Sequence, residues 1–195
     1  MKQRLLFVCL GNICRSPAAE GIMQQLVDDR GLSDQFHIES AAIGPWHIGD
    51  LPDSRMRRCG SKHGYNFNSR AQQLDSSYFD RFDLIIGMDH ENIRAISAKA
   101  RNEEDKRKIR LMADYLRHHP TQATIPDPYY GVERDFELVI DLLEDACEGL
   151  LEELIKKIAI WHRYFFCGSG GNRTLVHTRK PYAFYMLILA FIFVP

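Results

Sequence analysis

The chain has 195 residues, of which 45% are hydrophobic and 26% are charged. This composition is that of an ordinary globular protein with enough apolar residues for one buried core. Its 25 basic and 26 acidic residues give a formal net charge of −1, which excludes a general attraction to nucleic acid or to an anionic membrane. Any affinity for phosphate must therefore be local.

The cysteines indicate the redox environment. There are five of them, an odd number, widely spread, and the first residues lack the apolar stretch of a signal peptide. This pattern is typical of free thiols in a reducing cytoplasm. Cys9 and Cys14 have no companion pair of thiols or imidazoles at zinc-ligand spacing, so we expect neither a metal nor another cofactor.

The first part of the chain predicts a strand, a loop and a helix. Residues 5–8 are an apolar run, typical of a strand buried on both faces. After the loop, Ser16 fits a helix N-cap and Pro17 fits the first helical position. Apolar residues then recur at helical spacing as far as Gly31, which fits a C-terminal cap.

Strands and helices continue to alternate along the chain. The patterns predict further strands at 36–40, 84–88 and 109–112, and helices at 52–63, 91–99 and 136–158. Such alternation predicts an α/β domain over residues 1–158, with a parallel sheet covered by helices on both faces. Ligands of such sheets bind beyond the carboxyl ends of the strands, which is where the loop after Val8 falls.

Residues 159–195 differ in composition from the rest of the chain. A Gly-rich stretch follows Cys167, and residues 182–194 are almost wholly apolar without amphipathic periodicity. A helix that spans a membrane needs about 20 residues, so contact with a membrane surface is the most that this run predicts. We expect an extension that is foreign to the catalytic domain.

The loop at positions 9–16, Cys-Leu-Gly-Asn-Ile-Cys-Arg-Ser, has the features of a phosphate site. A short loop that leads from a strand into a helix offers backbone amides and the positive end of the helix dipole. Gly11 and Asn12 suit a sharp turn and a left-handed backbone. Arg15 offers a planar fork for two phosphate oxygens. A Walker-type loop is excluded because no Gly-Lys-Ser/Thr occurs.

Cys9 is the candidate nucleophile of this loop. A helix N-terminus and a guanidinium stabilise a thiolate, which is a strong nucleophile. Ser16 can donate a hydrogen bond to the sulfur or only cap the helix, and the sequence leaves both open. A lone buried cysteine is more often structural, but five residues followed by Arg-Ser, between a strand and a proline-started helix, favour catalysis.

The stretch Val-Cys-Leu-Gly-Asn-Ile-Cys-Arg-Ser-Pro at positions 8–17 resembles the signature of the low-molecular-weight protein tyrosine phosphatases. Three further stretches, 46–50, 82–89 and 126–131, resemble that family in the same order, and the resemblance covers residues 2–157. It implies a four-stranded parallel sheet of doubly wound, flavodoxin-like topology. It also implies an enzyme that hydrolyses phosphotyrosine through a phosphocysteine intermediate.

The same resemblance implies the roles of individual residues. Cys9 attacks phosphorus, Arg15 and the loop amides hold the phosphate oxygens, and Asp127 protonates the departing phenol. From the residues alone Asp127 would be a turn residue, since Asp-Pro is common in turns. The implied substrate-binding residues are those of the loop and three aromatic residues of the cleft: Leu10, Gly11, Asn12, Ile13, Cys14, Ser16, Trp46, Tyr129 and Tyr130.

Two features of the support around the loop are also expected. By resemblance Cys14 forms a reversible disulfide with Cys9, and the alternative is that it only fills space under the loop. The family often has a histidine where this chain has Ser69. We therefore expect Ser40 and Ser69 to supply the polar support beneath Asn12.

Three other functions share parts of this pattern. Arginine-phosphate phosphatases share the loop but tend to carry Thr in place of Ile13. Thiol-dependent arsenate reductases need a further cysteine pair, and Cys59 and Cys147 have no neighbouring cysteine. A non-enzymatic phosphate-binding module would not need both Cys9 and Asp127. The partner implied by the resemblance is a phosphotyrosine protein and, for a bacterial source, a tyrosine kinase that governs surface polysaccharide export.

Overall fold

The computed structural model describes residues 2–167 of the chain, with the side chains described as far as residue 159. The chain divides into two units, Met1–Ile158 and Ala159–Pro195. The Gly-rich stretch and the apolar run at 182–194 lie outside the described residues. Of the helices in the described part, none has the length and apolar character needed to cross a membrane.

Four parallel strands form one sheet in the order β2-β1-β3-β4. They are β1 (Gln3–Cys9), β2 (Phe36–Ala42), β3 (Leu84–Gly87) and β4 (Ile109–Leu111). The inner strand β1 pairs with β2 over its whole length and with β3 on its other edge. Leu5, Leu6, Phe7 and Val8 are all 0% exposed, because both faces of the sheet are covered.

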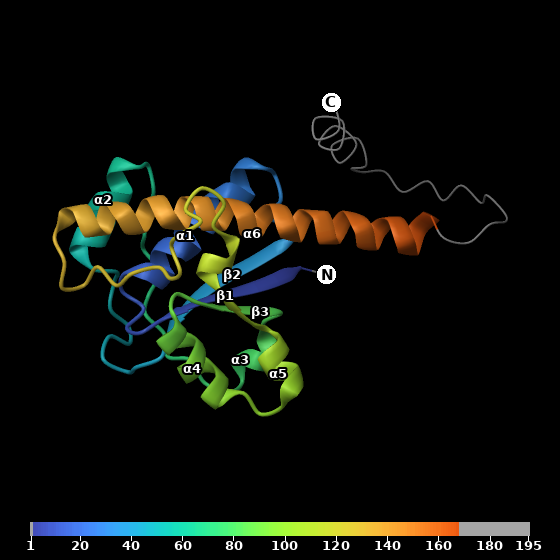
Figure 1. Cartoon of the computed structure of the whole chain (residues 1–195), viewed down its shortest axis with the longest axis horizontal. Coiled ribbons are helices and arrows are strands. Elements are labelled where there is room, and N and C mark those ends of the chain that lie inside the picture. Colours follow the sequence, from blue (N-terminus) through green and yellow to red (C-terminus); the bar gives the residue numbers. More distant parts are fainter. Residues whose placement is uncertain (1, 168–195) are drawn as a thin grey trace. The chain divides into compact units, whose positions relative to one another are not determined.

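The helices form one layer on each side of this sheet (Figure 1). On one side lie α1 (Arg15–Asp29) and the long α6 (Glu133–Cys167), which meet where the Cys147 thiol donates to the Ala19 carbonyl over 3.7 Å. On the other side lie α4 (His90–Lys99) and α5 (Glu103–Arg107). The predicted doubly wound α/β architecture is confirmed.

The remaining elements are short. They are α2 (Ser54–Lys62), capped by the Asp53 side chain, α3 (Tyr78–Arg81) and the 3-10 turn η1 (Met112–Tyr115). The sequence predicted α2, but not α3 or α5. Both have too few residues for helical periodicity to be recognised, and α5 lies in a charged stretch that reads as solvated surface.

Two predicted helix ends are wrong. Helix α1 begins at Arg15 with Cys14 as its N-cap residue, so Ser16 does not cap it and Pro17 is its third residue. The chain turns into the helix earlier than the proline suggested, and the Ser16 hydroxyl takes other partners. Helix α6 continues to Cys167, beyond the predicted end at residue 158.

Gly31 ends α1 as predicted. Its φ is 64°, and its N–H donates to the Asp28 carbonyl at 2.9 Å while that of Leu32 donates to Val27 at 2.9 Å. This is a left-handed helix end that favours glycine because it has no Cβ.

We predict that Gly31→Ala lowers the free energy of unfolding by about 1 kcal/mol, since an L-residue is strained in the left-handed region. Gly31→Asn should cost less, because asparagine tolerates that region. Urea denaturation of the three proteins measures the difference. Equal stability of Gly31→Ala and the parent chain would contradict this account of the helix end.

Candidate active site

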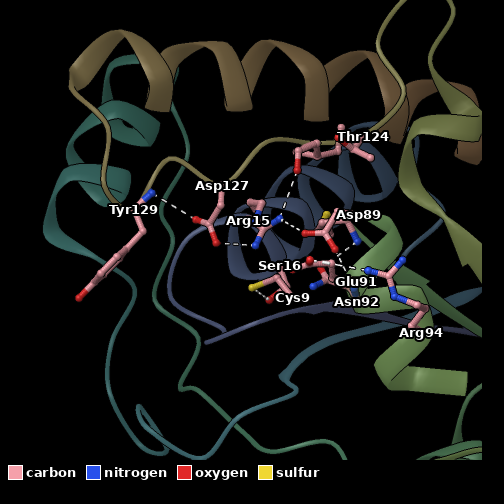
Figure 2. Close-up of polar contacts among 12 residues, drawn as sticks. Cys9, Arg15, Ser16, Asp89, Glu91, Asn92, Arg94, Thr124, Asp127 and Tyr129 are labelled. Atoms are coloured by element: carbon pink, nitrogen blue, oxygen red, sulfur yellow. Dashed lines mark hydrogen bonds and ion pairs between the residues drawn. The ribbon is translucent and has the colours of Figure 1, made fainter. Parts of the chain in front are cut away.

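The site forms where β1 and β3 end. Cys9 is the last residue of β1, and Asp89 follows the end of β3 by two residues. The segment that carries Asp127 joins them because the Ile125 N–H donates to the Met88 carbonyl at 2.8 Å. Three stretches far apart in sequence thus meet at one edge of the sheet (Figure 2), as expected for the carboxyl ends of parallel strands.

The Cys9 sulfur has two polar neighbours from its own loop. The Ser16 Oγ lies 3.0 Å from the Sγ, and the backbone N–H of Asn12 donates to the Sγ at 3.3 Å. Cys9 is 3% exposed, and α1 begins six residues further on, with its positive end at the loop. These contacts stabilise a thiolate. They also decide between the two predicted roles of Ser16 in favour of the sulfur.

Asn12 holds the loop in shape. Its φ is 55°, the one positive value among the described residues other than glycine. Its Oδ1 accepts from the Gln72 N–H at 3.0 Å, and its Nδ2 donates to the Ser16 Oγ at 2.9 Å and to the Ser40 Oγ at 2.7 Å. The side chain is thereby fully satisfied although it is buried, and the prediction that Ser40 supports Asn12 is confirmed.

Arg15 is a buried cation held by two carboxylates. One terminal nitrogen donates to the Asp89 Oδ2 at 2.6 Å and to the Ile125 carbonyl at 3.2 Å, and the other donates to the Asp127 Oδ2 at 2.5 Å. Burial lowers the pKa of the guanidinium, but the neighbouring Cys9, Asp127 and Asp89 outweigh burial and raise it. The Nε is buried and has no hydrogen-bond partner among the described residues, so it is a spare donor inside the site.

Asp127 lies at the edge of the site, with its side chain 40% exposed. Its second carboxylate oxygen accepts from the Tyr129 N–H at 3.2 Å. The Tyr129 and Tyr130 rings meet edge to face, 4.9 Å between centroids, and the Arg55 guanidinium lies 5.6 Å from the Tyr129 ring. The predicted acid and two predicted cleft aromatics therefore share one loop.

The predicted substrate-binding residues fall into two classes. Leu10, Trp46, Tyr129 and Tyr130 have exposed side chains, whereas those of Asn12, Ile13, Cys14 and Ser16 are buried. The Trp46 ring lies over Gly44, where a Cβ would come within 1.8 Å of it. The buried members shape the loop, and only the exposed members have side chains available to a bound molecule.

Cys14 differs chemically from Cys9. Burial raises the pKa of the Cys14 thiol, with further increases from Asp53 and Cys9, so it is neutral at physiological pH. Both cysteines are free thiols. The loop therefore contains one cysteine with donors on its sulfur and one that is held protonated.

Comparison with known proteins agrees with this geometry. The sequence profile of the family described as low molecular weight phosphotyrosine protein phosphatase matches residues 4–160. The chain belongs to this family. It is thus a protein tyrosine phosphatase, a hydrolase of a family that uses a catalytic cysteine.

The alignments with individual relatives span nearly the whole length of those related proteins. The chain is 42% identical over 150 residues to the low molecular weight phosphotyrosine protein phosphatase of Gallus gallus, covering 76% of this chain and 94% of that protein. It is 38% identical over 162 residues to the corresponding protein of Streptomyces coelicolor, covering 81% and 97%. A crystal structure of the protein tyrosine phosphatase of Entamoeba histolytica superposes with a TM-score of 0.78 at 41% identity, covering 80% and 99%.

Several residues of the phosphatase site were not predicted. Asp89 pairs with Arg15, Gln72 anchors Asn12, and His47 lies against Gly11, with its Cδ2 3.1 Å from where a Cβ would stand. Asp89 could have been found, because polar residues just after a strand of a parallel sheet gather at the ligand edge. Gln72 acts through its backbone, for which the sequence carries no signal.

Outside this site, one group of described residues has ligand atoms close enough for a metal ion. Cys59, Glu133 and Glu137 place theirs within 4.8 Å of one another, on α2 and α6. Lys62 forms ion pairs with both glutamates and already balances their charge. We assign no ion to this group.

We predict that Asp89→Ser lowers kcat/KM on the order of tenfold, or about 1.4 kcal/mol, because Arg15 loses one of its two carboxylates. Asp89 also caps α4 through the Asn92 N–H, and serine keeps that cap. Asp89→Ala removes both and should cost an additional 0.5 to 2 kcal/mol or thereabouts in unfolding free energy. Steady-state kinetics and thermal melting separate the two effects, and an unchanged kcat/KM in Asp89→Ser would contradict the role of this ion pair.

Proposed function

We propose that the phosphatase cleaves phosphotyrosine with Cys9 as the nucleophile, Arg15 as the phosphate-holding cation and Asp127 as the proton donor. The observation that carries this assignment is the 2.5 Å ion pair between Arg15 and Asp127. It brings a carboxyl group from 112 positions further along the chain to the loop that holds Cys9. Nucleophile, cation and acid are then adjacent.

In the first step, the Cys9 thiolate forms a bond to phosphorus as the bond from phosphorus to the tyrosine oxygen breaks. The spare Nε donor of Arg15 and the loop amides hold the phosphate oxygens. When the bound phosphate takes the place of Asp127 on Arg15, this carboxylate takes up a proton from solvent, and it then transfers that proton to the departing phenolate oxygen. The products are a protein substrate with an unphosphorylated tyrosine side chain and a phosphocysteine at position 9.

In the second step, a water molecule attacks the phosphocysteine. The ionised Asp127 accepts a proton from the water, the bond between sulfur and phosphorus breaks, and phosphate leaves. The leaving sulfur takes the negative charge. The Ser16 hydroxyl and the Asn12 N–H, at 3.0 and 3.3 Å from the sulfur, stabilise that charge, which makes Cys9 a good leaving group as well as a good nucleophile.

The exposed aromatic side chains suit a phenyl ring as substrate. Trp46 and Tyr129 are 67% and 37% exposed, and aromatic faces bind an aromatic ring by stacking or edge contacts. We place the substrate ring between these two side chains. Tyr130, at 97% exposure, is then available to the polypeptide around the phosphotyrosine.

The partner of the family is a phosphotyrosine protein. For a bacterial source we infer a more specific partner in the same cytoplasm, a tyrosine kinase that governs surface polysaccharide export. Release of phosphate from such an autophosphorylated kinase, compared with an unrelated phosphotyrosine protein, tests this. Equal rates on the two would contradict it.

We predict that Cys9→Ser abolishes hydrolysis of a phosphotyrosine peptide, whereas Cys14→Ser retains it. Asp127→Ala should lower kcat roughly 100- to 10,000-fold, with a larger loss for leaving groups that are poorer than p-nitrophenolate. A series of aryl phosphates with different leaving groups measures this. An equal loss for good and poor leaving groups would exclude Asp127 as the proton donor.

The same assay distinguishes the alternative functions. Phosphoarginine peptides should be hydrolysed more slowly than phosphotyrosine peptides, and arsenate should not be reduced in the presence of thioredoxin. Faster hydrolysis of phosphoarginine would replace the proposed substrate while leaving the roles of Cys9 and Arg15 in place.

We further propose that residues 1–158 are the complete catalytic domain. Cys9, Arg15, Asp127 and the cleft aromatics all lie within this unit. A chain that ends at Ile158 should keep kcat/KM within about twofold, as expected for a domain with its own core. Loss of activity on removal of residues 159–195 would show that the extension takes part in catalysis.

A further inference from the structure

A hydrogen-bond chain leads from the Cys9 loop to an acidic side chain that the mechanism does not use. The Ser40 hydroxyl, which contacts Asn12, also lies 2.5 Å from the Glu20 Oε2. Glu20 is on α1, eleven residues after the nucleophile. It lines one pocket with Ser69, which acts to lower the pKa of the Glu20 carboxyl. Ser69, which stands where the family often has a histidine, therefore lies near Glu20, and the Asn12 side chain has Gln72, Ser16 and Ser40 as its partners instead.

The direction of each hydrogen bond in this chain can be assigned. The Asn12 Oδ1 accepts from a backbone N–H, that of Gln72, so the Asn12 Nδ2 must be the donor to both serines. Because Ser40 accepts from Asn12, its own proton is free to go to Glu20. By the same reasoning, Ser16 accepts from Asn12 and its proton is free to go to the Cys9 sulfur.

Two acceptors therefore stand at the ends of one connected set of donors. Asn12 is at its centre, the Ser40 hydroxyl donates a hydrogen bond to Glu20, and the Ser16 hydroxyl donates one to the Cys9 sulfur. Ser16 has one competing acceptor, the Ala41 carbonyl, at the longer distance of 3.5 Å. Whatever holds Asn12 in place also keeps the Ser16 hydroxyl directed at the sulfur, since hydrogen bonds in a buried network reinforce one another.

We propose that Glu20 is a positioning residue for the nucleophile: its carboxylate is the terminal acceptor that fixes Ser40, Asn12 and Ser16 so that Ser16 donates to the Cys9 thiolate. This inference rests on the proposed role of Cys9. It adds a residue that touches neither substrate nor sulfur, yet sets how well the sulfur carries negative charge.

The surroundings of Glu20 make its charge sensitive to pH. Burial raises its pKa, the hydrogen bonds from Ser40 and Ser69 lower it, and Glu39 of β2 raises it further, with a net increase. Asp28 and Asp29 of α1 line the same pocket of roughly 450 Å³, and the segment 66–69 contributes uncharged residues to it. Among these described neighbours Glu20 meets only negative charges.

The sign of the effect follows from this direction. Above its raised pKa Glu20 is ionised and accepts from Ser40, so the network is complete. As the pH falls through that pKa, the carboxyl gains a proton and Ser40 loses its charged acceptor. The contribution of Glu20 to the reactivity of Cys9 should therefore be present near neutral pH and disappear in acid.

The test is the rate of Cys9 alkylation by iodoacetamide as a function of pH, in the full chain carrying Cys14→Ser so that one loop thiol is measured. Glu20→Gln should slow alkylation severalfold near neutral pH, and Glu20→Ala on the order of tenfold, as for other coupled networks. The ratio of parent to Glu20→Gln rates should approach one in acid, where the parent Glu20 is neutral too. A ratio that stays constant over the whole range indicates a structural defect only and would overturn the proposal.

Two controls sharpen this test. Asp28→Asn removes a carboxylate from the same pocket but not from the hydrogen-bond chain, and it should leave the alkylation profile unchanged. An effect as large as that of Glu20→Gln would overturn the proposal, because any nearby negative charge would then change the reactivity of Cys9. In a Ser40→Ala background, Glu20→Gln should have no further effect, because the connection is already broken. Full additivity of the two changes would also overturn it.

Alkylation needs no phosphate ester, so the proposal can fail separately from the proposed function. A chain that shows the Glu20-dependent profile but does not hydrolyse p-nitrophenyl phosphate would reject the phosphatase assignment and keep the positioning role. Hydrolysis of p-nitrophenyl phosphate together with an unchanged alkylation profile in Glu20→Gln and Glu20→Ala would keep the phosphatase assignment and reject the positioning role of Glu20.

Discussion

The site is organised around the buried charge of Arg15. Removing a guanidinium from water costs several kcal/mol unless close, well-oriented partners compensate for it. Here the partners are Asp89, Asp127 and the Ile125 carbonyl, which come from the end of β3 and from the segment before α6. The cation therefore ties separate parts of the chain together. The same arrangement that makes its burial tolerable places a carboxyl group beside the phosphate loop.

Hydrogen bonds of the Asn12 side chain fix the conformation of the loop. Asn12 adopts a left-handed backbone conformation, which costs roughly 1–2 kcal/mol for an L-residue, and its side chain makes three hydrogen bonds that offset this cost. One of them places Ser16 against the Cys9 sulfur. Loop conformation and nucleophile charge are thus two results of one network, and the contact between Ser40 and Glu20 extends that network to a second residue of α1.

The local parts of this design could be predicted from the sequence. Cys9, Gly11, Asn12 and Arg15 stand within one short loop between a buried strand and a helix, and their spacing alone indicates an anion site. The alternation of strands and helices likewise predicted the sheet and most of its helices. The sequence left the role of Ser16 open. Ser16 would cap the helix only if the helix began after it, and the sequence does not give the first helical residue, which is Arg15.

The parts that could not be predicted depend on long-range contacts. Asp89 lies 74 positions from Arg15, and Gln72 lies 60 positions from Asn12, so no local pattern connects them. Glu20 reads as an ordinary polar residue of a helix until Ser40 of a neighbouring strand is seen against it. Such pairs are brought together by the order of strands in the sheet, which the family resemblance implied but the residues alone did not.

The central claim is that Cys9 carries the phosphate during turnover. It can be tested by mixing Asp127→Ala with p-nitrophenyl phosphate, whose leaving group departs without an acid, quenching during turnover and locating the phosphate by mass spectrometry. The account predicts one added phosphate on Cys9 that accumulates and then decays, because hydrolysis of the phosphocysteine lacks its base. Hydrolysis of the substrate with Cys9 unmodified throughout, or with the phosphate on Cys14, would contradict it.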